Sequence, residues 1–268
     1  MATCNCIASG ILLLHLQIQS NHYMSGEKEW FASWFDTPYY HTLYKHRDFD
    51  EAERFIRNLL DYLKLPKDAI CLDLACGKGR HSVFLNKNGL NVTGLDLSAN
   101  SIEEAKPFEN HKLAFDVHDM REVYKKSSYD IIFNLFTSFG YFDDHSDNLK
   151  VLKSMHGMLK PEGLVVIDFM NVNKTIKNLV KTESKKIDGI TFNIKRSYDG
   201  EHIFKNIAFE DDDKSYEYQE RVQEINHSAF LSLLKDAGFE VQDTFGNFSL
   251  KPFDIESSDR LIFIAKKQ

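Results

Sequence analysis

The chain has few cysteines, and their spacing matches no common framework. The four cysteines are Cys4, Cys6, Cys71 and Cys76. Disulfide-rich folds and structural zinc sites need paired cysteines or cysteine–histidine groups at short, regular intervals, and no such pattern occurs here. The cysteine content therefore favours a reducing compartment, which we take to be the cytoplasm, and it predicts no metal site.

Long hydrophobic runs are also missing. The longest apolar stretch near the start, Ile7 to Ile18, is interrupted by polar residues and is not preceded by Lys or Arg. It is too short to span a membrane and lacks the charged start of a signal peptide. We therefore expect no membrane association. We interpret residues 1–23 as a disordered or artificially added extension, with Met24 as a natural start.

Positive charge is in deficit as well. The chain of 268 residues has 33 Lys and Arg against 40 Asp and Glu, for a formal net charge of −7. Proteins that bind nucleic acid need a basic face, because much of their affinity comes from neutralised phosphates. The charge balance therefore disfavours a nucleic-acid partner. The length suits one sizeable α/β domain with additions.

The most informative motif is the segment Asp73–Ser82, which has the sequence DLACGKGRHS. The apolar run Ala69–Leu74 predicts a strand that ends at this motif, and residues 79–88 predict a helix. Such a turn brings backbone N–H groups to a ligand at a helix N-terminus. A second predicted strand, Asn91–Asp96, places the Asp96 carboxylate where ribose hydroxyls bind. The pattern predicts a nucleoside-binding βαβ unit.

The residues that are absent narrow down the nucleoside. A dinucleotide fold needs a third glycine where this chain has Ser82, and no Gly-Lys-Ser/Thr phosphate loop occurs. We therefore expect a cofactor with ribose and base but without pyrophosphate. S-adenosylmethionine fits, because its carboxylate suits a helix N-terminus and its positive groups suit Asp73.

The motifs LDLACGKGRHS and VTGLDLS resemble those of the class I S-adenosylmethionine-dependent methyltransferases, with the small-molecule branch most similar. The resemblance extends from about residue 30 to 268. It implies an α/β fold: a Rossmann-like seven-stranded, mostly parallel sheet with helices on both faces. It also implies cofactor contacts from the first two strand ends, which we assign to Asp73, Ala75, Cys76, Gly77, Gly79, Asp96, Leu97 and Ser98.

A third strand is predicted over Lys112–Val117. In the family that the chain resembles, an acid after this strand accepts a hydrogen bond from the adenine amine, and its neighbour packs on the ring. The matching residues are Asp119 and Met120. An amine buried without an acceptor would cost about 1–3 kcal/mol, so a carboxylate suits this position. The alternative is that Asp119 caps a following helix.

The fourth predicted strand, Tyr129–Leu135, runs into an aromatic loop that extends to Phe142. Ligands in parallel sheets bind outside the carboxyl ends of strands, where the strand order reverses. We assign Asn134, Leu135 and Phe136 to the cofactor, and Phe139 and Tyr141 to the acceptor, although Phe139 also suits a core position. The loop lacks the Asn/Asp-Pro-Pro-aromatic signature of enzymes that methylate adenine or glutamine, and its rings suit a small enclosed acceptor.

Residues 24–66 predict a helical, aromatic cap that includes a helix over about 50–63. The resemblance implies that this cap folds over the cofactor and that Tyr40 and Tyr44 reach its methionine end. The alternative is that these rings only pack on the sheet.

Residues 171–225 predict an inserted antiparallel β-meander. The segments Thr191–Tyr198 and His202–Phe209 alternate around Asp199-Gly200, which is a strong hairpin signal, and Tyr216–Ile225 follows as a third strand. We expect a lid over the acceptor or, as the alternative, a dimerisation edge.

The remaining segments, 67–170 and 226–268, predict the cofactor-binding domain. After the fourth strand we expect a helix over about 147–159, a turn at Lys160–Gly163 and a strand over Leu164–Phe169. The last 43 residues predict a helix over about 228–237 and two closing strands, Phe239–Phe245 and Arg260–Ala265.

Methyl transfer from a sulfonium mainly requires alignment of the nucleophile and exclusion of water, which can supply about 7–11 kcal/mol of the barrier. Tyr141 and His227 are the candidate catalytic groups, with His118 as a further titratable candidate. Arg221 and Arg260 are candidates for holding an acceptor carboxylate. The expected function is transfer of a methyl group to a small molecule by a monomer or homodimer. An RNA or protein methyltransferase and a non-catalytic cofactor-binding subunit remain alternatives, and the acceptor atom stays open.

Overall fold

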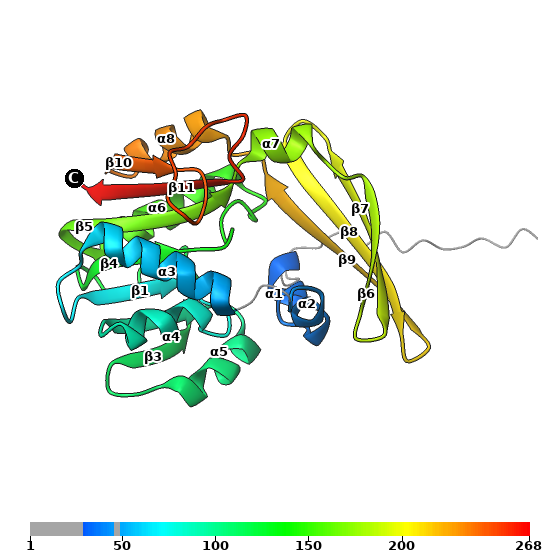
Figure 1. Cartoon of the computed structure of the whole chain (residues 1–268), viewed down its shortest axis with the longest axis horizontal. Coiled ribbons are helices and arrows are strands. Elements are labelled where there is room, and N and C mark those ends of the chain that lie inside the picture. The colour runs from blue at the N-terminus through cyan, green and yellow to red at the C-terminus, as the bar shows by residue number, and fades with distance from the viewer. Residues whose placement is uncertain (1–28, 46–48) are drawn as a thin grey trace, which may run out of the picture.

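The computed structural model describes residues 29–45 and 49–268. The predicted extension at residues 1–23 therefore lies outside the described residues. The chain forms a seven-stranded sheet with helices on both faces and a separate four-stranded antiparallel sheet beside it (Figure 1).

The large sheet has the strand order β10-β11-β5-β4-β1-β2-β3. Its strands are β1 (Ile70–Leu74), β2 (Asn91–Asp96), β3 (Leu113–Val117), β4 (Tyr129–Asn134), β5 (Leu159–Met170), β10 (Phe239–Phe245) and β11 (Arg260–Lys267). β1 pairs in parallel with β2 on one side and with β4 on the other, so the strand order reverses at β1. Only β11 runs antiparallel, between β5 and β10. This arrangement confirms the predicted fold class.

Two hydrophobic cores lie on the two faces of this sheet. One face is covered by α3 (Phe49–Leu63), α4 (Arg80–Lys87) and α5 (Ala99–Ala105), which is continued by a short 3-10 helix, η1 (Lys106–Phe108). The other face is covered by α6 (His145–Met158) and α8 (His227–Asp236). The central strands bury side chains on both faces, which explains why they are almost continuously apolar in sequence.

The insert differs from the prediction in having four strands rather than three. After α7 (Val172–Lys177), its strands are β6 (Thr182–Ile187), β7 (Ile190–Tyr198), β8 (His202–Asp211) and β9 (Lys214–Gln223), in that order across the sheet. The additional strand is β6. Its sequence, TESKKI, carries polar residues on both faces, because it is an edge strand with little buried surface, so alternation of hydrophobicity could not reveal it.

Two short N-terminal helices fill the space between the two sheets (Figure 1). These are α1 (Trp30–Trp34) and α2 (Pro38–Leu43). Trp34 and Leu43 are buried in a third core against the inner face of the small sheet, whose members there are Phe192, Ile194, Ile207 and Phe209. Trp34 also donates from Nε1 to Glu220 of β9 at 2.8 Å. The small sheet therefore holds the N-terminal helices in place.

A second difference concerns the start of β5. The predicted turn at Lys160–Gly163 lies within the strand, because β5 begins pairing with β4 at Leu159. The register shifts between the Tyr129–Leu159 and Ile131–Leu164 pairs, and Glu162 has a φ of 64°. The four residues form an irregularity in the strand rather than a connection before it. Elsewhere the predicted element boundaries differ from those of the structure by a few residues.

A search of the described helices for one long and apolar enough to cross a membrane found none.

Gly94, in the middle of β2, allows the sheet and the turn after β1 to approach each other. A Cβ placed there would lie 2.5 Å from the ring of Phe115 and 3.0 Å from the sulfur of Cys76. Overpacking of this kind costs about 1–3 kcal/mol. We predict that Gly94→Ala lowers the free energy of unfolding by this amount in urea denaturation. Adding Phe115→Leu should restore part of the lost stability, because the smaller side chain relieves the clash. If the effects of the two substitutions on the free energy of unfolding simply add, the steric explanation is wrong.

Candidate functional site

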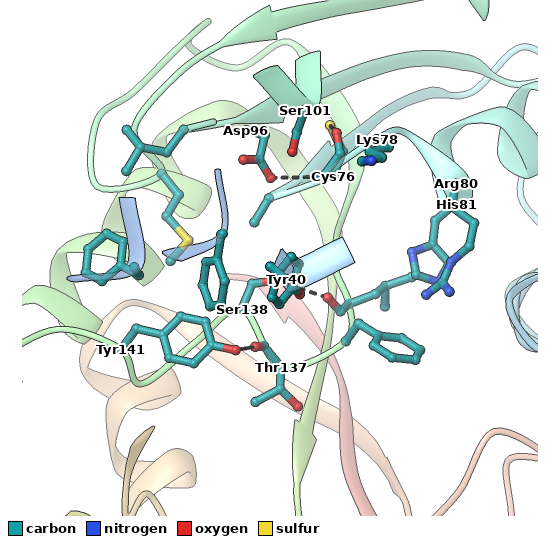
Figure 2. A pocket seen from close by; sticks show the side chains of 18 of the residues that line it. Tyr40, Cys76, Lys78, Arg80, His81, Asp96, Ser101, Thr137, Ser138 and Tyr141 are labelled. Carbon is teal, nitrogen blue, oxygen red and sulfur yellow. Dashed lines mark hydrogen bonds between the residues drawn. The ribbon is translucent and has the colours of Figure 1, made fainter. Parts of the chain in front are cut away.

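A cavity of about 380 Å³ opens at the carboxyl ends of the parallel strands, where the strand order reverses. Its lining comes from the turn after β1, the end of β2, the segment after β3, the loop after β4, and the helices α1 and α2 (Figure 2). Ligands of doubly wound sheets bind at this position. The cavity therefore lies where the sequence predicts the site.

The turn after β1 presents backbone to the cavity. The N–H of Cys76 donates to the carbonyl of Leu95 at 2.9 Å, and the N–H of Gly77 donates to Oδ2 of Asp96 at 2.7 Å. Gly77 has a φ of +55°, and a Cβ there would meet no atom within 4 Å. A ligand can therefore approach the Gly77 backbone closely.

Gly79 has a different role from Gly77. Its φ is +76°, and a Cβ there would lie 2.5 Å from the Phe115 ring. Gly79 does not line the cavity, whereas Ala75, Cys76 and Gly77 do. The glycine allows α4 to begin close to β3.

The two carboxylates of the motif lie on neighbouring strands but differ in access. Asp73 pairs with Gly94 in register, and Asp96 ends the same neighbouring strand. Asp96 lines the cavity, whereas Asp73 is 1% exposed and does not. The hydroxyl of Ser82 donates to Asp73 at 2.5 Å and holds the carboxylate beneath the turn. Only Asp96 of the pair therefore faces the cavity.

Both carboxylates are perturbed by burial. Burial raises the pKa of Asp73 to about 6, and the negative charge of Asp96 adds to this shift, while the hydrogen bond from Ser82 opposes it. Burial also raises the pKa of Asp96, against the hydrogen bonds that its carboxylate accepts from the N–H groups of Ser98 and Gly77. Perturbed carboxylates of this kind cluster at functional sites, and these two lie at the turn that borders the cavity.

Asp119 and Met120 line the cavity after β3, together with His118. Arg121 binds the Asp119 carboxylate through Nε at 3.1 Å and Nη2 at 2.6 Å. Burial works against ionisation of Asp119, but the hydrogen bonds and charge of Arg121 outweigh it and lower its pKa. The carboxylate therefore stays an ionised acceptor. Since no helix begins until His145, Asp119 is not a helix cap.

The loop after β4 supplies one wall of the cavity. Leu135, Phe136, Thr137 and Ser138 line it, and Tyr141 donates from its hydroxyl to the carbonyl of Thr137 (Figure 2). Phe139 does not line it.

Phe139 is fully buried and packs on Phe230 of α8 at 5.0 Å between ring centroids. It takes the core position that was the alternative for this residue. Asn134 is also fully buried, below the loop, and donates to the carbonyl of Leu74 at 2.9 Å.

Aromatic rings from the N-terminal helices form the facing wall. Phe35 lies 5.2 Å from Tyr141 and 4.8 Å from Tyr40, and Tyr40 lies 4.9 Å from Tyr44, measured between ring centroids. All four rings line the cavity. Tyr44 also donates from its hydroxyl to Glu220 of the small sheet at 2.7 Å. The predicted cap thus reaches the cavity, and it also packs on the small sheet.

Several candidates lie away from the cavity. His227 stacks between Phe253 and Phe263, and burial lowers its pKa. Ser98 caps α5, accepting from the N–H of Ser101 at 3.0 Å. The structure therefore does not bring His227 or Ser98 to the lining.

The two candidate arginines also stay outside the lining, and both are paired with carboxylates. Arg221 pairs with Asp143, and Arg260 pairs with Asp168 at 2.7 Å. An arginine already held by a carboxylate is not placed to recognise a second one in the cavity.

Some lining residues were not predicted, notably His41, Arg80 and His81. Arg80 and His81 directly follow the glycine turn, so their position at the start of α4 was the available signal. Burial and the nearby charge of Lys78 lower the pKa of His41 to about 4. Burial and the charge of Arg80 lower the pKa of His81 to about 3. Both histidines are therefore neutral at pH 7.

The chain is similar to known methyltransferases. A family model described as a methyltransferase domain matches residues 71–163. A putative methyltransferase, YqeM of Bacillus subtilis (strain 168), is 26% identical over 245 residues, covering 85% of this chain and 94% of that protein. A glycine/sarcosine N-methyltransferase of Aphanothece halophytica is 26% identical, covering 92% of each chain.

Among solved structures, an S-adenosylmethionine-dependent methyltransferase from Clostridium acetobutylicum ATCC 824 has a TM-score of 0.73 at 20% identity, covering 85% of this chain and 96% of that one. Its fold is the one described above.

The raised pKa of Asp73 predicts a pH dependence of stability. The folded protein keeps this proton between about pH 4 and 6, whereas the unfolded chain loses it near 3.8. Stability from the protonated form is complete below pH 4 and is lost as the pH rises through 6, an effect of about 3 kcal/mol. In urea denaturation, the stability of Asp73→Asn relative to wild type should therefore rise by that amount between pH 4 and 6.5.

The matched control is Asp144→Asn. Asp144 accepts from the N–H of Ser146, which lowers the pKa of its carboxyl below 3.8, so its difference from wild type should change little between pH 4 and 6.5 and should change mainly below about pH 4. A difference for Asp73→Asn that does not vary with pH would contradict the assignment.

Proposed function

We propose, from the premise that the chain is a class I S-adenosylmethionine-dependent methyltransferase, that it transfers the methyl group to an amine nitrogen of a small molecule. The observation that carries this proposal is the composition of the cavity lining. A first part of the lining consists of the glycine turn and the Asp96 carboxylate, and a second part consists of aromatic rings. The glycine/sarcosine N-methyltransferase among the relatives supports an amine acceptor.

The residues of the first part fit S-adenosylmethionine. Gly77 leaves open space where a side chain would stand, and Asp96 offers a carboxylate fixed by two backbone N–H groups. A carboxylate held this way suits ribose hydroxyls. Met120 and Leu97 add apolar surface to the lining, and the ionised Asp119 adds an acceptor. When bound, the cofactor supplies an electrophilic methyl group on a sulfonium.

The aromatic part fits the acceptor. Rings exclude water and contribute about 0.5–2 kcal/mol to binding an ammonium group through cation–π contact. Phe35 contacts both Tyr40 and Tyr141, so the three rings form one continuous aromatic surface that suits a small acceptor. The neutral His41 and His81 add no further positive charge beside an amine.

The chain's own residues act mainly by orientation. The rings hold the acceptor, and the loop after β4 sets the direction of approach. We propose Tyr141 as the nearest titratable group to a reacting amine. Its ring lines the cavity in the loop after β4 and contacts Phe35 of the facing wall. Its hydroxyl donates to the carbonyl of Thr137, which fixes the position of the ring in the wall formed by the loop after β4.

The insert at residues 171–225 is proposed to act as a support for the acceptor wall. Its sheet packs on α1 and α2, and those helices supply the rings. The hydrogen bonds from Trp34 and Tyr44 to Glu220 connect the two directly. We accordingly divide the chain into a cap (24–66), an insert (171–225) and a cofactor-binding domain (67–170 and 226–268).

We also propose that the protein works in a reducing compartment, the cytoplasm. Cys71 and Cys76 are both free and buried. Burial raises the pKa of both thiols, which leaves them unreactive.

Asp96 is expected to dominate cofactor affinity. Asp96→Asn keeps the shape of the side chain but removes the charge, and a lost charge-assisted hydrogen bond costs about 1.5–3 kcal/mol. Binding of S-adenosylhomocysteine, measured by calorimetry, should weaken tenfold to a hundredfold. Asp116→Asn on the neighbouring β3 should leave the affinity unchanged. Wild-type protein that binds neither S-adenosylmethionine nor S-adenosylhomocysteine would refute the premise.

The acceptor class can be tested with S-adenosylmethionine carrying a tritiated methyl group. Glycine, sarcosine, glucosamine, total cellular RNA and a cellular protein extract are offered in parallel. We expect label in one or more of the small amines and none in RNA or protein. Labelled RNA or protein with no labelled amine would overturn the proposal in favour of a macromolecular substrate.

A further inference from the structure

Two neighbouring residues in the loop after β4 have an unusual backbone conformation. Phe136 has a φ of 69° and Thr137 a φ of 59°, although neither is glycine and threonine is β-branched. Side chains disfavour this region, so residues keep it only when their surroundings hold them there. Both residues line the cavity. The question is what holds them.

The buried Asp168, near the end of β5, binds both residues. Its Oδ2 accepts from the N–H of Phe136 at 2.9 Å, and its backbone carbonyl accepts from the N–H of Thr137 at 3.0 Å. Asp168 is fully buried. A buried carboxylate needs a positive partner, because isolated charges are costly in the interior.

Arg260, at the start of β11, is that partner, and it also reaches the loop. Its Nε donates to Oδ1 of Asp168 at 2.7 Å, and its Nη2 donates to Oγ1 of Thr137 at 2.9 Å. One planar guanidinium therefore ties the carboxylate and the loop side chain together. Lysine, with a single ammonium on a flexible stem, cannot reproduce this fork.

A stack of rings ties Arg260 to the other side of the loop. Its guanidinium lies 5.5 Å from the centre of the Phe248 ring, and Phe248 is stacked on Phe136 at 6.0 Å with 23° between the planes. The guanidinium of Arg80 lies 4.6 Å from the Phe136 ring on the cavity side. Both the backbone and the ring of Phe136 are thus connected to Arg260.

We propose that Arg260 is a positioning residue for methyl transfer, acting through Asp168 and Thr137 to hold Phe136 and Thr137 in the conformation that forms the cavity wall after β4. This inference rests on the proposed function. It replaces the expectation that Arg260 binds an acceptor carboxylate, since Arg260 is outside the cavity lining and its fork is engaged.

The first test uses Thr137, because its variants leave the Arg260–Asp168 ion pair intact. Thr137→Ser keeps the hydroxyl that accepts from Arg260, and Thr137→Val removes it with little change of shape. We expect Thr137→Val to lower kcat at least tenfold for the amine of the panel that wild type methylates best. Thr137→Ser should stay within threefold of wild type. Affinity for S-adenosylhomocysteine should change less than threefold in both.

The second test uses Arg260→Lys and hydrogen–deuterium exchange. The amides of Phe136 and Thr137 donate to Asp168, so their exchange rates report the loop conformation directly. We expect exchange at least tenfold faster in Arg260→Lys, with kcat lowered and KM for S-adenosylmethionine unchanged. The control is Arg196→Lys, which disturbs the ion pair between Glu183 of the small sheet and an arginine about as exposed as Arg260. It should leave loop exchange and kcat unchanged.

A double-variant comparison separates positioning from direct contact, because Thr137 itself lines the cavity. If Thr137 acts through Arg260, Thr137→Val should have no further effect on kcat in the Arg260→Lys background. An equal loss in both backgrounds would overturn the proposal, as would wild-type exchange rates in folded Arg260→Lys. If Arg260→Lys fails to fold, exchange and kcat in Thr137→Val decide. If wild type methylates no amine, the proposed function fails, while the exchange rates still decide the role of Arg260.

Discussion

The site depends on the way one half-buried carboxylate organises the backbone around it. Asp96 accepts from the N–H of Gly77 at 2.7 Å and from the N–H of Ser98 at 2.8 Å, so the turn after β1 and the start of α5 are fixed to the end of β2. On folding, the carboxylate exchanges hydrogen bonds with water for hydrogen bonds from these two N–H groups. Burial nevertheless raises its pKa. A ligand that offers further donors completes its shell. Because these hydrogen bonds hold the turn in place, the open backbone at Gly77 keeps a fixed position against which a ligand can bind.

The fold was largely predictable because its signals are local. Strand Asn91–Asp96 was predicted with its observed boundaries, and β1 and α4 within a residue or two, since the βαβ unit fits within about 30 consecutive residues. Strand β6 was missed because an edge strand needs no buried face and its sequence shows none. Within the site, the prediction for Asp73 and Asp96 correctly placed them on adjoining strands. The hydroxyl of Ser82, which turns Asp73 away from the cavity, could not be foreseen from the motif.

The remaining site features arise from contacts between residues far apart in sequence. Arg260 looked free to bind an acceptor, but its partner Asp168 lies 92 residues earlier. His227 looked like a base, but its ring stacks on two phenylalanine rings outside the cavity lining. The rings of Tyr40 and Tyr44 follow helical spacing, which is equally typical of a core. Their position at the cavity depends on the small sheet behind them, and no local pattern encodes that packing.

The N-terminal helices lie between the cavity and the small sheet. Among the described residues, none of the small sheet lines the cavity. Mutations behind the rings, on the inner face of β7 and β8, can therefore shift the aromatic wall of the cavity while the Asp96 turn stays intact. Substitutions in the core behind the rings and substitutions in the turn around Asp96 are therefore expected to alter different walls of the same cavity.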